Sequence, residues 1–405
     1  MTQVAPPKFE VWSPVVRRNP HPVYAQMRAE APICQTIGPV SGNTFWFFTR
    51  YDDCVNVLRD DRFGKDFRAH LPPELLEQYG QPDPFTAAIE KHLLNLDPPD
   101  HTRLRQLVHK AFTARMIENL RPRIAEIAAD LIATIRAKQG DSIDLIADFA
   151  FPLPIIVICE LLGIPSEERD DFGRWSRTIL FGTDMNATGA AVMEVLQYLN
   201  EIFEARRAHP KDDLITALLQ TEEAGDVLDR QELISMIFLL LVAGHETTVN
   251  LIGNGMLALM QNPDQKALLL ARPELNNSAV EEMLRFGSPV ENTLARWTYE
   301  DITMRGQTIK QGDVIFATLA AANRDPEVFT DPDRFDITRT PNKHIAFGGG
   351  IHFCLGAPLA RMEGQIAIPA LLAQFPQIEL AIDPDQLVWA NQILLRGVAT
   401  LPVTV

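Results

Sequence analysis

The segment from Leu233 to Met260 constrains the fold more than any other part of the chain, because it is apolar nearly all round. A helix without a polar face is normally buried. At 1.5 Å per residue, its 28 residues would extend about 42 Å, which is the scale of a whole domain. The segment therefore predicts one long helix that crosses the centre of a large protein.

A short polar insert, Gly244 to Thr248, interrupts this apolar segment near its midpoint. A buried polar group without a partner costs of order 1–3 kcal/mol, and a glycine inside a helix costs roughly 0.5–1 kcal/mol relative to alanine. Thr247 can bond the carbonyl of Ala243, four residues back, and open the helix locally. Such unfavourable residues at the centre of a buried helix indicate a functional site.

The rest of the chain predicts a mainly α-helical protein with a minor sheet. Apolar residues recur at helical spacing in the segments Ala111–Ala137, Met193–Arg207, Leu228–Met260 and Asn277–Phe286. Runs of β-branched or aromatic residues predict strands at Thr44–Thr49, Trp297–Thr303, Asp313–Leu319 and near Leu401–Val405. Length alone favours two or three domains, yet no repeat, low-complexity tract or long linker marks a boundary.

Composition excludes several classes of protein. The 405 residues include 37 Lys and Arg against 53 Asp and Glu, which gives a formal charge of −16. A nucleic-acid or anionic-membrane binder would carry a basic surface, so neither is expected as a partner. The N-terminus lacks the apolar core of a signal peptide, and the run Met236–Gly244 is far short of the roughly 20 residues that span a bilayer. We therefore expect a cytoplasmic protein without a membrane anchor.

One of the four cysteines stands in an unusual context. Cys354 follows a glycine-rich loop and precedes an apolar helical segment, in FGGGIHFCLGAPLARMEG. A thiol at a helix N-terminus has its anionic form favoured by free backbone N–H groups. The loop is not a P-loop, because no Gly-Lys-Ser/Thr follows it. It is not a dinucleotide fingerprint either, because Phe353 stands where the third glycine would be. No CxxC pair or spaced set of ligands indicates zinc, and the other three cysteines fit core positions.

The loop resembles the haem-binding signature of the cytochrome P-450 superfamily, in the pattern Phe347-Gly348-x-Gly350-x-His352-x-Cys354-x-Gly356. The resemblance implies that Cys354 is the axial ligand of the iron of haem b, iron protoporphyrin IX, and that Phe347, Gly348 and Gly356 contact the haem. It covers essentially the whole chain and is greatest to soluble bacterial members of polyketide and secondary metabolism.

The superfamily resemblance implies a single domain over residues 1–405, although length alone favours two or three domains. The haem would lie between the long central distal helix and the proximal thiolate loop with its helix. A small β-rich part would come from the first ~70 residues, from 295–320 and from the C-terminal end. Pro369, inside the helix after the thiolate, predicts a kink or a break there, because a proline in a helix interior removes a hydrogen bond.

The same resemblance assigns roles to the polar insert. Ala243, Gly244, Glu246 and Thr247 match the oxygen-binding segment, in which Glu246 and Thr247 form an acid–alcohol pair that relays protons. The absence of a side chain at Gly244 is expected to leave room for a diatomic ligand.

A second pattern, Glu282-x-x-Arg285, places an acid and a base on one helix face. The resemblance implies that this pair is buried and is joined by an arginine from a later segment, for which Arg334 is the best match. The expected role of this triad is structural support beneath the haem.

Four basic residues are expected to bind the haem propionates. His101 and Arg105 share a helix face at positions i and i+4, and the resemblance adds Arg296 and His352. Arginine suits carboxylates because its fork donates two parallel hydrogen bonds. Other basic residues, such as Arg103, are candidates for the surface that faces an electron donor.

The substrate pocket follows from position in the family pattern. The residues expected to line it are Leu94, Leu240, Val290, Glu291, Thr293, Ile393 and Leu394. Pockets of this kind are mostly apolar with a few orienting polar groups, a role open to Glu291. The proline-rich segment Arg68–Leu94 is expected to be a mobile lid.

The resemblance implies a haem-thiolate monooxygenase that inserts one oxygen atom from O2 into an apolar small molecule by hydroxylation or epoxidation. Electrons would come from NAD(P)H through a reductase and a ferredoxin or flavodoxin, because the chain has no flavin or nicotinamide fingerprint. Two alternatives are a peroxygenase driven by hydrogen peroxide and a non-enzymatic haem-thiolate sensor or binding protein. The acid–alcohol pair counts against both.

Overall fold

The computed structural model describes residues 9–38, 42–82, 84–138, 142–181, 184–223, 228–390 and 392–405. Its helices are α1 (Pro14–Arg18), α2 (His21–Glu30), α3 (Tyr51–Arg59), α4 (Phe67–His70), α5 (Pro73–Leu76), α6 (Pro84–Ile89), α7 (Asp100–Ala111), α8 (Ala114–Asn119), α9 (Arg121–Ala137), α10 (Pro152–Leu162), α11 (Arg169–Phe181), α12 (Met185–Ala208), α13 (Leu214–Glu223), α14 (Arg230–Gln261), α15 (Pro263–Ala271), α16 (Asn276–Gly287), α17 (Leu319–Ala322) and α18 (Ala357–Gln374). Its strands are β1 (Ile33–Ile37), β2 (Thr44–Phe48), β3 (Phe63–Gly64), β4 (Ile143–Asp144), β5 (Arg296–Thr298), β6 (Ile302–Met304), β7 (Gln307–Ile309), β8 (Val314–Ala317), β9 (Glu379–Leu380) and β10 (Pro402–Thr404).

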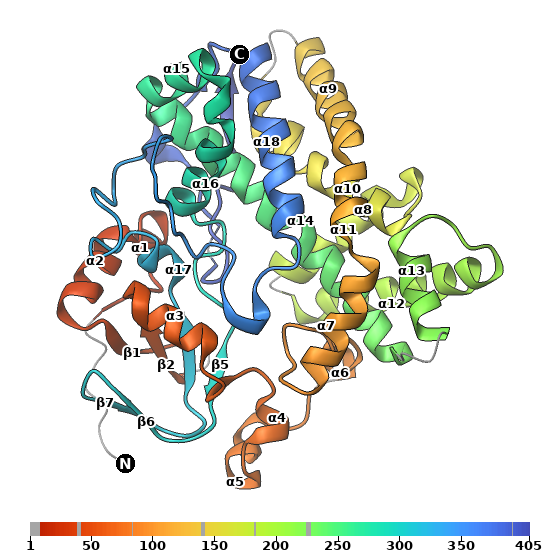
Figure 1. The fold of residues 1–405 in the computed structure, drawn as a ribbon, viewed down its shortest axis with the longest axis vertical. Coiled ribbons are helices and arrows are strands. Elements are labelled where there is room, and N and C mark those ends of the chain that lie inside the picture. Colours follow the sequence, from red (N-terminus) through yellow and green to blue (C-terminus); the bar gives the residue numbers. More distant parts are fainter. Residues whose placement is uncertain are drawn as a thin grey trace.

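Helix α14 is the long central helix that the apolar segment predicts. It runs through the middle of the molecule and packs against α10, α16 and α18 (Figure 1). A capping box begins it, because the Asp229 side chain accepts from the backbone N–H of Glu232 and the Glu232 side chain bonds back to the Asp229 N–H. By length and composition α14 could cross a membrane, but 67% of its most apolar window is buried inside the protein. It is therefore placed as a core helix.

The predicted helix Ala111–Ala137 is wrong in its extent, because the structure divides it between α7, α8 and α9. The Thr113 side chain accepts from the backbone N–H of Met116 and so begins α8, and Pro122 lies in the first turn of α9. A proline fits the start of a helix, where its missing N–H leaves no bond unmade. The other predicted helices correspond to parts of α12, α14 and α16.

A β-rich region combines strands from distant parts of the chain. The five-stranded sheet has the order β1-β2-β8-β5-β3, and its parallel pair β2–β8 joins the N-terminal strands to residues 314–317. Figure 1 shows these strands on the side of the molecule away from α9 to α13. The predicted strand Trp297–Thr303 is divided between β5 and β6, whereas β2, β8 and β10 lie where strands are predicted.

Helix α18 follows the glycine-rich loop and continues through Pro369 to Gln374. Proline cannot donate to the carbonyl four residues back, which here is that of Gln365. The side-chain amide of Asn276, at the start of α16, donates to this carbonyl at 2.7 Å. Of the predicted kink or break at Pro369, the break is therefore wrong, because α18 continues and a neighbouring helix supplies the missing donor, while the kink stays a prediction.

Candidate active site

The middle of α14 presents an accessible face although the helix is otherwise largely buried. His245 and Leu241 are buried, whereas Ala243 is exposed and Leu240 and Thr247 are partly exposed. Residues 240, 243 and 247 share one face, because they are spaced three or four positions apart. The Thr247 hydroxyl donates to the carbonyl oxygen of Ala243 at 3.1 Å, as the sequence predicts. Accessible side chains at the centre of a core helix indicate a hollow inside the protein.

Gly244 has a different effect from the predicted one. A Cβ at this position would lie 3.1 Å from Cδ1 of Ile158 in α10. The missing side chain thus lets α10 pack closely against α14. The space that the glycine leaves is directed toward α10 rather than held open for a ligand.

Glu246 is a buried acid near the middle of this helix. Burial raises the pKa of its carboxyl group to about 7, against an opposing effect from the positive charge of Arg177. A group whose pKa lies near the working pH can both give and take a proton. Its placement beside Thr247 therefore suits proton transfer at the hollow.

The glycine-rich loop before α18 adopts backbone conformations that favour glycine. Gly348 has φ of 70° and Gly350 has φ of 65°. A Cβ at Gly350 would lie 2.2 Å from the carbonyl oxygen of Leu58, so the loop passes directly against α3. A Cβ at Gly348 would meet no atom within 4 Å, which leaves open space beside the loop.

Cys354 is an exposed cysteine at the end of this loop. Its backbone N–H donates to the carbonyl oxygen of Phe347 at 3.1 Å. Nearby protein raises the pKa of the Cys354 thiol by desolvation, and the N–H groups of Gly356 and Ala357 lower it only in part. The predicted stabilisation by the helix N-terminus is thus present but smaller than the desolvation of the thiolate by the surrounding protein. A cation bound at the sulfur would supply the remaining stabilisation of the thiolate.

The four basic residues predicted to bind propionates converge near this loop. The rings of His101 and His352 lie edge to face, with centroids 4.5 Å apart. No ring nitrogen of His101 or His352 has a partner within hydrogen-bond distance in the described ranges, although Nε2 of His352 lies 3.9 Å from a carboxylate oxygen of Asp97, and Nε of buried Arg296 also has no partner. Burial, with the nearby charges of His352 and Arg105, lowers the pKa of His101 to about 4. Buried donors without partners fit the carboxylates of a bound ligand.

Arg105 has a different position in this cluster. Its guanidinium donates to the carbonyl oxygens of Ile351 at 3.1 Å and Phe353 at 2.7 Å. It therefore fixes the backbone of the loop next to Cys354. The orphaned donors, the open space beside Gly348 and the exposed sulfur together fit a haem.

Glu282 and Arg285 form a fully buried ion pair in α16, with an Nη2–Oε1 distance of 2.7 Å. The third member of this cluster is Arg339, whose Nε lies 3.2 Å from Glu282 Oε2. The prediction of Arg334 is wrong, because that residue contributes its backbone carbonyl, which accepts from Arg285 at 3.0 Å and from Arg339 at 3.1 Å. The cluster fixes the segment that leads into the glycine-rich loop, since Asn342 also donates to Glu282 at 3.1 Å.

Comparison with known proteins identifies the family. The family model described as cytochrome P450 matches residues 42–172, 155–271 and 269–396, which is most of the chain. The chain belongs to the cytochrome P450 family. The predicted resemblance is thus confirmed, and the family implies a haem-iron cofactor.

Relatives of this P450 are similar along their whole length. Cytochrome P450 107B1 of Saccharopolyspora erythraea is 47% identical, over 100% of this chain and 99% of that protein. The structure of a myxobacterial P450, CYP267B1, in complex with myristic acid has a TM-score of 0.91 and 48% identity, and covers 97% of this chain and 98% of that one. The Bacillus subtilis bacillaene polyketide synthase P450, PksS, has a TM-score of 0.90 and 44% identity, with 98% and 99% covered. The predicted fold class and the P450 monooxygenase class are confirmed.

The pocket residues predicted for this P450 separate into two groups. Six of them are partly buried, as a lining position requires: Leu94, Leu240, Val290, Thr293, Ile393 and Leu394. Glu291 is fully buried, and its two carboxylate oxygens accept from Arg17 at 2.6 Å each, with a further hydrogen bond from Tyr24. The prediction that Glu291 orients a ligand is therefore wrong, because N-terminal side chains use its carboxylate.

Sequence reasoning missed Arg339, the donor Asn276 and the buried hydrogen bond between Ser176 and His245. The segment around Arg334 also contains Arg339, but the spacing of the two arginines does not indicate which one reaches Glu282. The predicted lid, Arg68–Leu94, is not an irregular loop in its described part, because that part contains the short helices α5 and α6. Its mobility stays a prediction.

Proposed function

We propose that this P450 inserts one atom of O2 into a C–H bond or an alkene of an apolar substrate. The other oxygen atom leaves as water, and the balance requires two electrons and two protons for each O2. Three observations carry the proposal: the exposed sulfur of Cys354 at the glycine-rich loop, the buried donors without partners beside that loop, and the accessible face in the middle of the otherwise buried helix α14. We further propose that residues 1–405 act as one domain around that hollow.

The cofactor of this proposal is haem b. When bound, it supplies the chemistry of O2 activation, with its iron held by the Cys354 thiolate. His101, His352 and Arg296 would donate to its propionates, because these side chains have buried donors without partners among the described residues. Arg105 would act mainly by holding the loop, and Phe347, Gly348 and Gly356 would contact the cofactor.

The distal residues are proposed to handle protons. Glu246 carries a proton near neutral pH, because burial raises its pKa to about 7. Thr247 presents its hydroxyl on the accessible face beside Ala243. Together they would deliver protons to the hollow while the surrounding apolar helix excludes bulk water. Gly244 contributes by letting α10 pack closely.

The proposed substrate is a long apolar chain, such as a fatty acyl or polyketide group. One similar structure holds myristic acid, and another relative belongs to a polyketide synthase system. The six partly buried pocket residues are almost all apolar. The hydroxyl of Thr293 accepts from the backbone N–H of Ala317 at 3.1 Å, so it is already bonded.

Electrons are proposed to come from NAD(P)H through a reductase and a ferredoxin or flavodoxin, with all components in the cytoplasm. Basic residues of α7 are candidates for the docking surface, but Arg103 is paired with Glu232, so it is less free than the sequence suggests. The peroxygenase alternative predicts faster turnover with hydrogen peroxide than with the reconstituted electron chain. The sensor alternative predicts no oxidised product.

The decisive experiment is the carbon monoxide difference spectrum of the reduced protein and of Cys354→Ala. We expect the thiolate-type Soret band in the wild type and its loss in the variant. A wild type without this band would contradict the proposal. A screen of fatty acids, terpenoids, steroids and macrolides for displacement of the resting spectrum would then identify the substrate class.

A further inference from the structure

A buried hydrogen bond joins α11 to α14 one residue before the acid of the candidate site. Ser176 Oγ lies 3.2 Å from His245 Nε2, and both side chains are buried. The other ring nitrogen, Nδ1, lies 2.8 Å from the carbonyl oxygen of Leu241. A carbonyl can only accept, so Nδ1 carries the proton of the neutral ring. Nε2 is then an acceptor, and the Ser176 hydroxyl donates to it.

The ring of His245 stays neutral in the physiological range. Burial lowers the pKa of His245 to about 4, aided by the positive charge of Arg177 and opposed by the hydrogen bond to Leu241. The ring also packs edge to face against Phe151, with centroids 5.8 Å apart. Nε2 therefore offers one lone pair, and one donor can use it at a time.

Glu246 is a second donor within reach of this lone pair. Its Oε2 lies 3.6 Å from His245 Nε2, just beyond hydrogen-bond distance. Because burial raises the pKa of Glu246 to about 7, a substantial fraction of the Glu246 carboxyl groups carries an O–H near neutral pH. Two O–H groups, from Ser176 and from Glu246, thus lie next to one acceptor.

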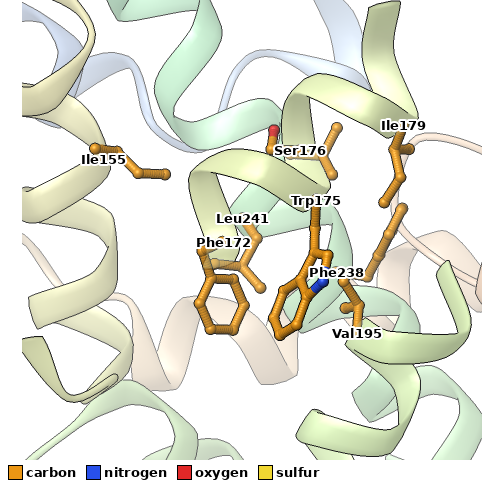
Figure 2. Close-up of a pocket in the computed structure, with 9 residues that line it drawn as sticks. Ile155, Phe172, Trp175, Ser176, Ile179, Val195, Phe238 and Leu241 are labelled. Atoms are coloured by element: carbon orange, nitrogen blue, oxygen red, sulfur yellow. The ribbon is translucent and has the colours of Figure 1, made fainter. Parts of the chain in front are cut away.

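The cavity beside Ser176 offers no substitute for its hydroxyl. Figure 2 shows Ser176 and Trp175 of α11 at the wall of a cavity that also includes residues of α10, α12 and α14. Ser176 and Trp175 alone among the lining residues carry side-chain polar groups, the others being Ile155, Phe172, Ile179, Val195, Phe238, Leu241 and Val242. The indole N–H of Trp175 is donated to Glu194 at 2.5 Å. None of the other cavity-lining residues can therefore replace Ser176 at His245, whereas Glu246 already has its Oε2 3.6 Å from Nε2. The guanidinium of Arg177 is a further donor in this region, because its charge acts on both His245 and Glu246.

We propose that His245 is a positioning residue for Glu246: Ser176 occupies Nε2 while α11 is seated on α14, and the Glu246 carboxyl group takes Nε2 when Ser176 is removed. The inference rests on the proposed function, in which Glu246 supplies protons to the hollow. With Ser176 in place, the carboxyl group is free to turn toward Thr247. Without it, the acid is held on His245 and away from the hollow. Proton supply thereby depends on the contact between the two helices.

Four forms of the holoenzyme test this competition: wild type, Ser176→Ala, Ser176→Ala with His245→Asn, and Thr178→Ala. Asparagine places its amide near Nδ1, so it can keep the bond to Leu241 while removing the Nε2 acceptor. Thr178 is the matched control, because its hydroxyl donates to the Arg174 carbonyl of its own helix at 3.0 Å.

The primary readout is the infrared carbonyl band of the protonated Glu246 side chain, assigned by its absence in Glu246→Gln. We expect a shift to lower frequency in Ser176→Ala, because the O–H then donates to a ring nitrogen. The band should return to the wild-type position in the double variant and stay there in Thr178→Ala. A band that does not move in Ser176→Ala, or that stays shifted in the double variant, overturns the inference.

The second readout is the ratio of oxidised product to hydrogen peroxide with myristic acid, NADPH, and a ferredoxin with its reductase. We expect Ser176→Ala to lower this ratio about tenfold, part of the roughly 10²–10⁴ that a positioned acid contributes. The double variant should recover the wild-type ratio. Equal ratios in Ser176→Ala and Thr178→Ala overturn the inference, whereas a wild type that oxidises nothing while showing the expected bands counts against the proposed function alone.

Discussion

The variant Glu246→Gln tests whether burial holds the acid of α14 in its neutral form. Burial raises the pKa of Glu246 from 4.5 to about 7. Since one pKa unit corresponds to about 1.36 kcal/mol, the folded protein disfavours the carboxylate by about 3 kcal/mol. Glutamine has nearly the same shape and carries no charge at any pH, so it removes this cost.

The sign of the effect follows from proton binding. The folded protein has the higher Glu246 pKa, so it binds more protons than the unfolded chain between pH 4.5 and 7. Its free energy of unfolding therefore falls as the pH rises through this window. We expect the variant to gain on the wild type by about 3 kcal/mol between about pH 4 and about pH 8.

Denaturant unfolding of both proteins at a series of pH values measures this gain. The difference between the two curves cancels the other titrating groups, because both proteins share them. In the same series, the wild type should lose product formation above pH 7, and the variant should be slow at every pH. Parallel stability curves would refute the reasoning, since they would mean that Glu246 is solvated like a surface carboxylate.

Two further substitutions test the packing around the thiolate loop. Arg339→Ala should destabilise the fold by about 1–3 kcal/mol, because it removes charged hydrogen bonds to a buried carboxylate that keeps Arg285 as its partner, whereas Arg334→Ala should cost under about 1 kcal/mol; equal melting temperatures would contradict this assignment. Asn276→Ala should cost about 1–3 kcal/mol by orphaning the carbonyl of Gln365. Calorimetry of the same change with Pro369→Ala present should show a smaller loss, since the restored N–H can bond that carbonyl, and an equal loss would exclude this role.

Local signals predicted much of this P450 from its sequence. The apolar run around the polar insert predicts α14, because both the burial and the interruption lie within one continuous segment. The glycine-rich loop before Cys354 could also be predicted from local sequence, because its glycines and the helix that follows are adjacent in the chain. Thr247 forms the predicted bond to Ala243 because the two residues are one helical turn apart.

Contacts between distant segments were the ones predicted wrongly. Arg334 and Arg339 lie on one irregular stretch, and the direction of each side chain depends on turns that carry no periodic pattern. The break at Pro369 fails for the same kind of reason, because its rescue comes from Asn276 in another helix. A hydrogen bond of this sort has no trace in the local sequence.

The loop that begins at Val290 shows why the pocket is the least predictable part of the site. Its next residue, Glu291, is held by Arg17, 274 residues earlier in the chain. Arg396 then donates to the carbonyl oxygens of Arg17 at 3.0 Å and Arg18 at 3.1 Å, which joins the C-terminal segment to the same cluster. Side chains near both ends of the chain thus fix this loop, so its position depends on residues far from it in the sequence. The Glu291 carboxylate, which the sequence leaves open as a ligand-orienting group, is instead bonded to Arg17.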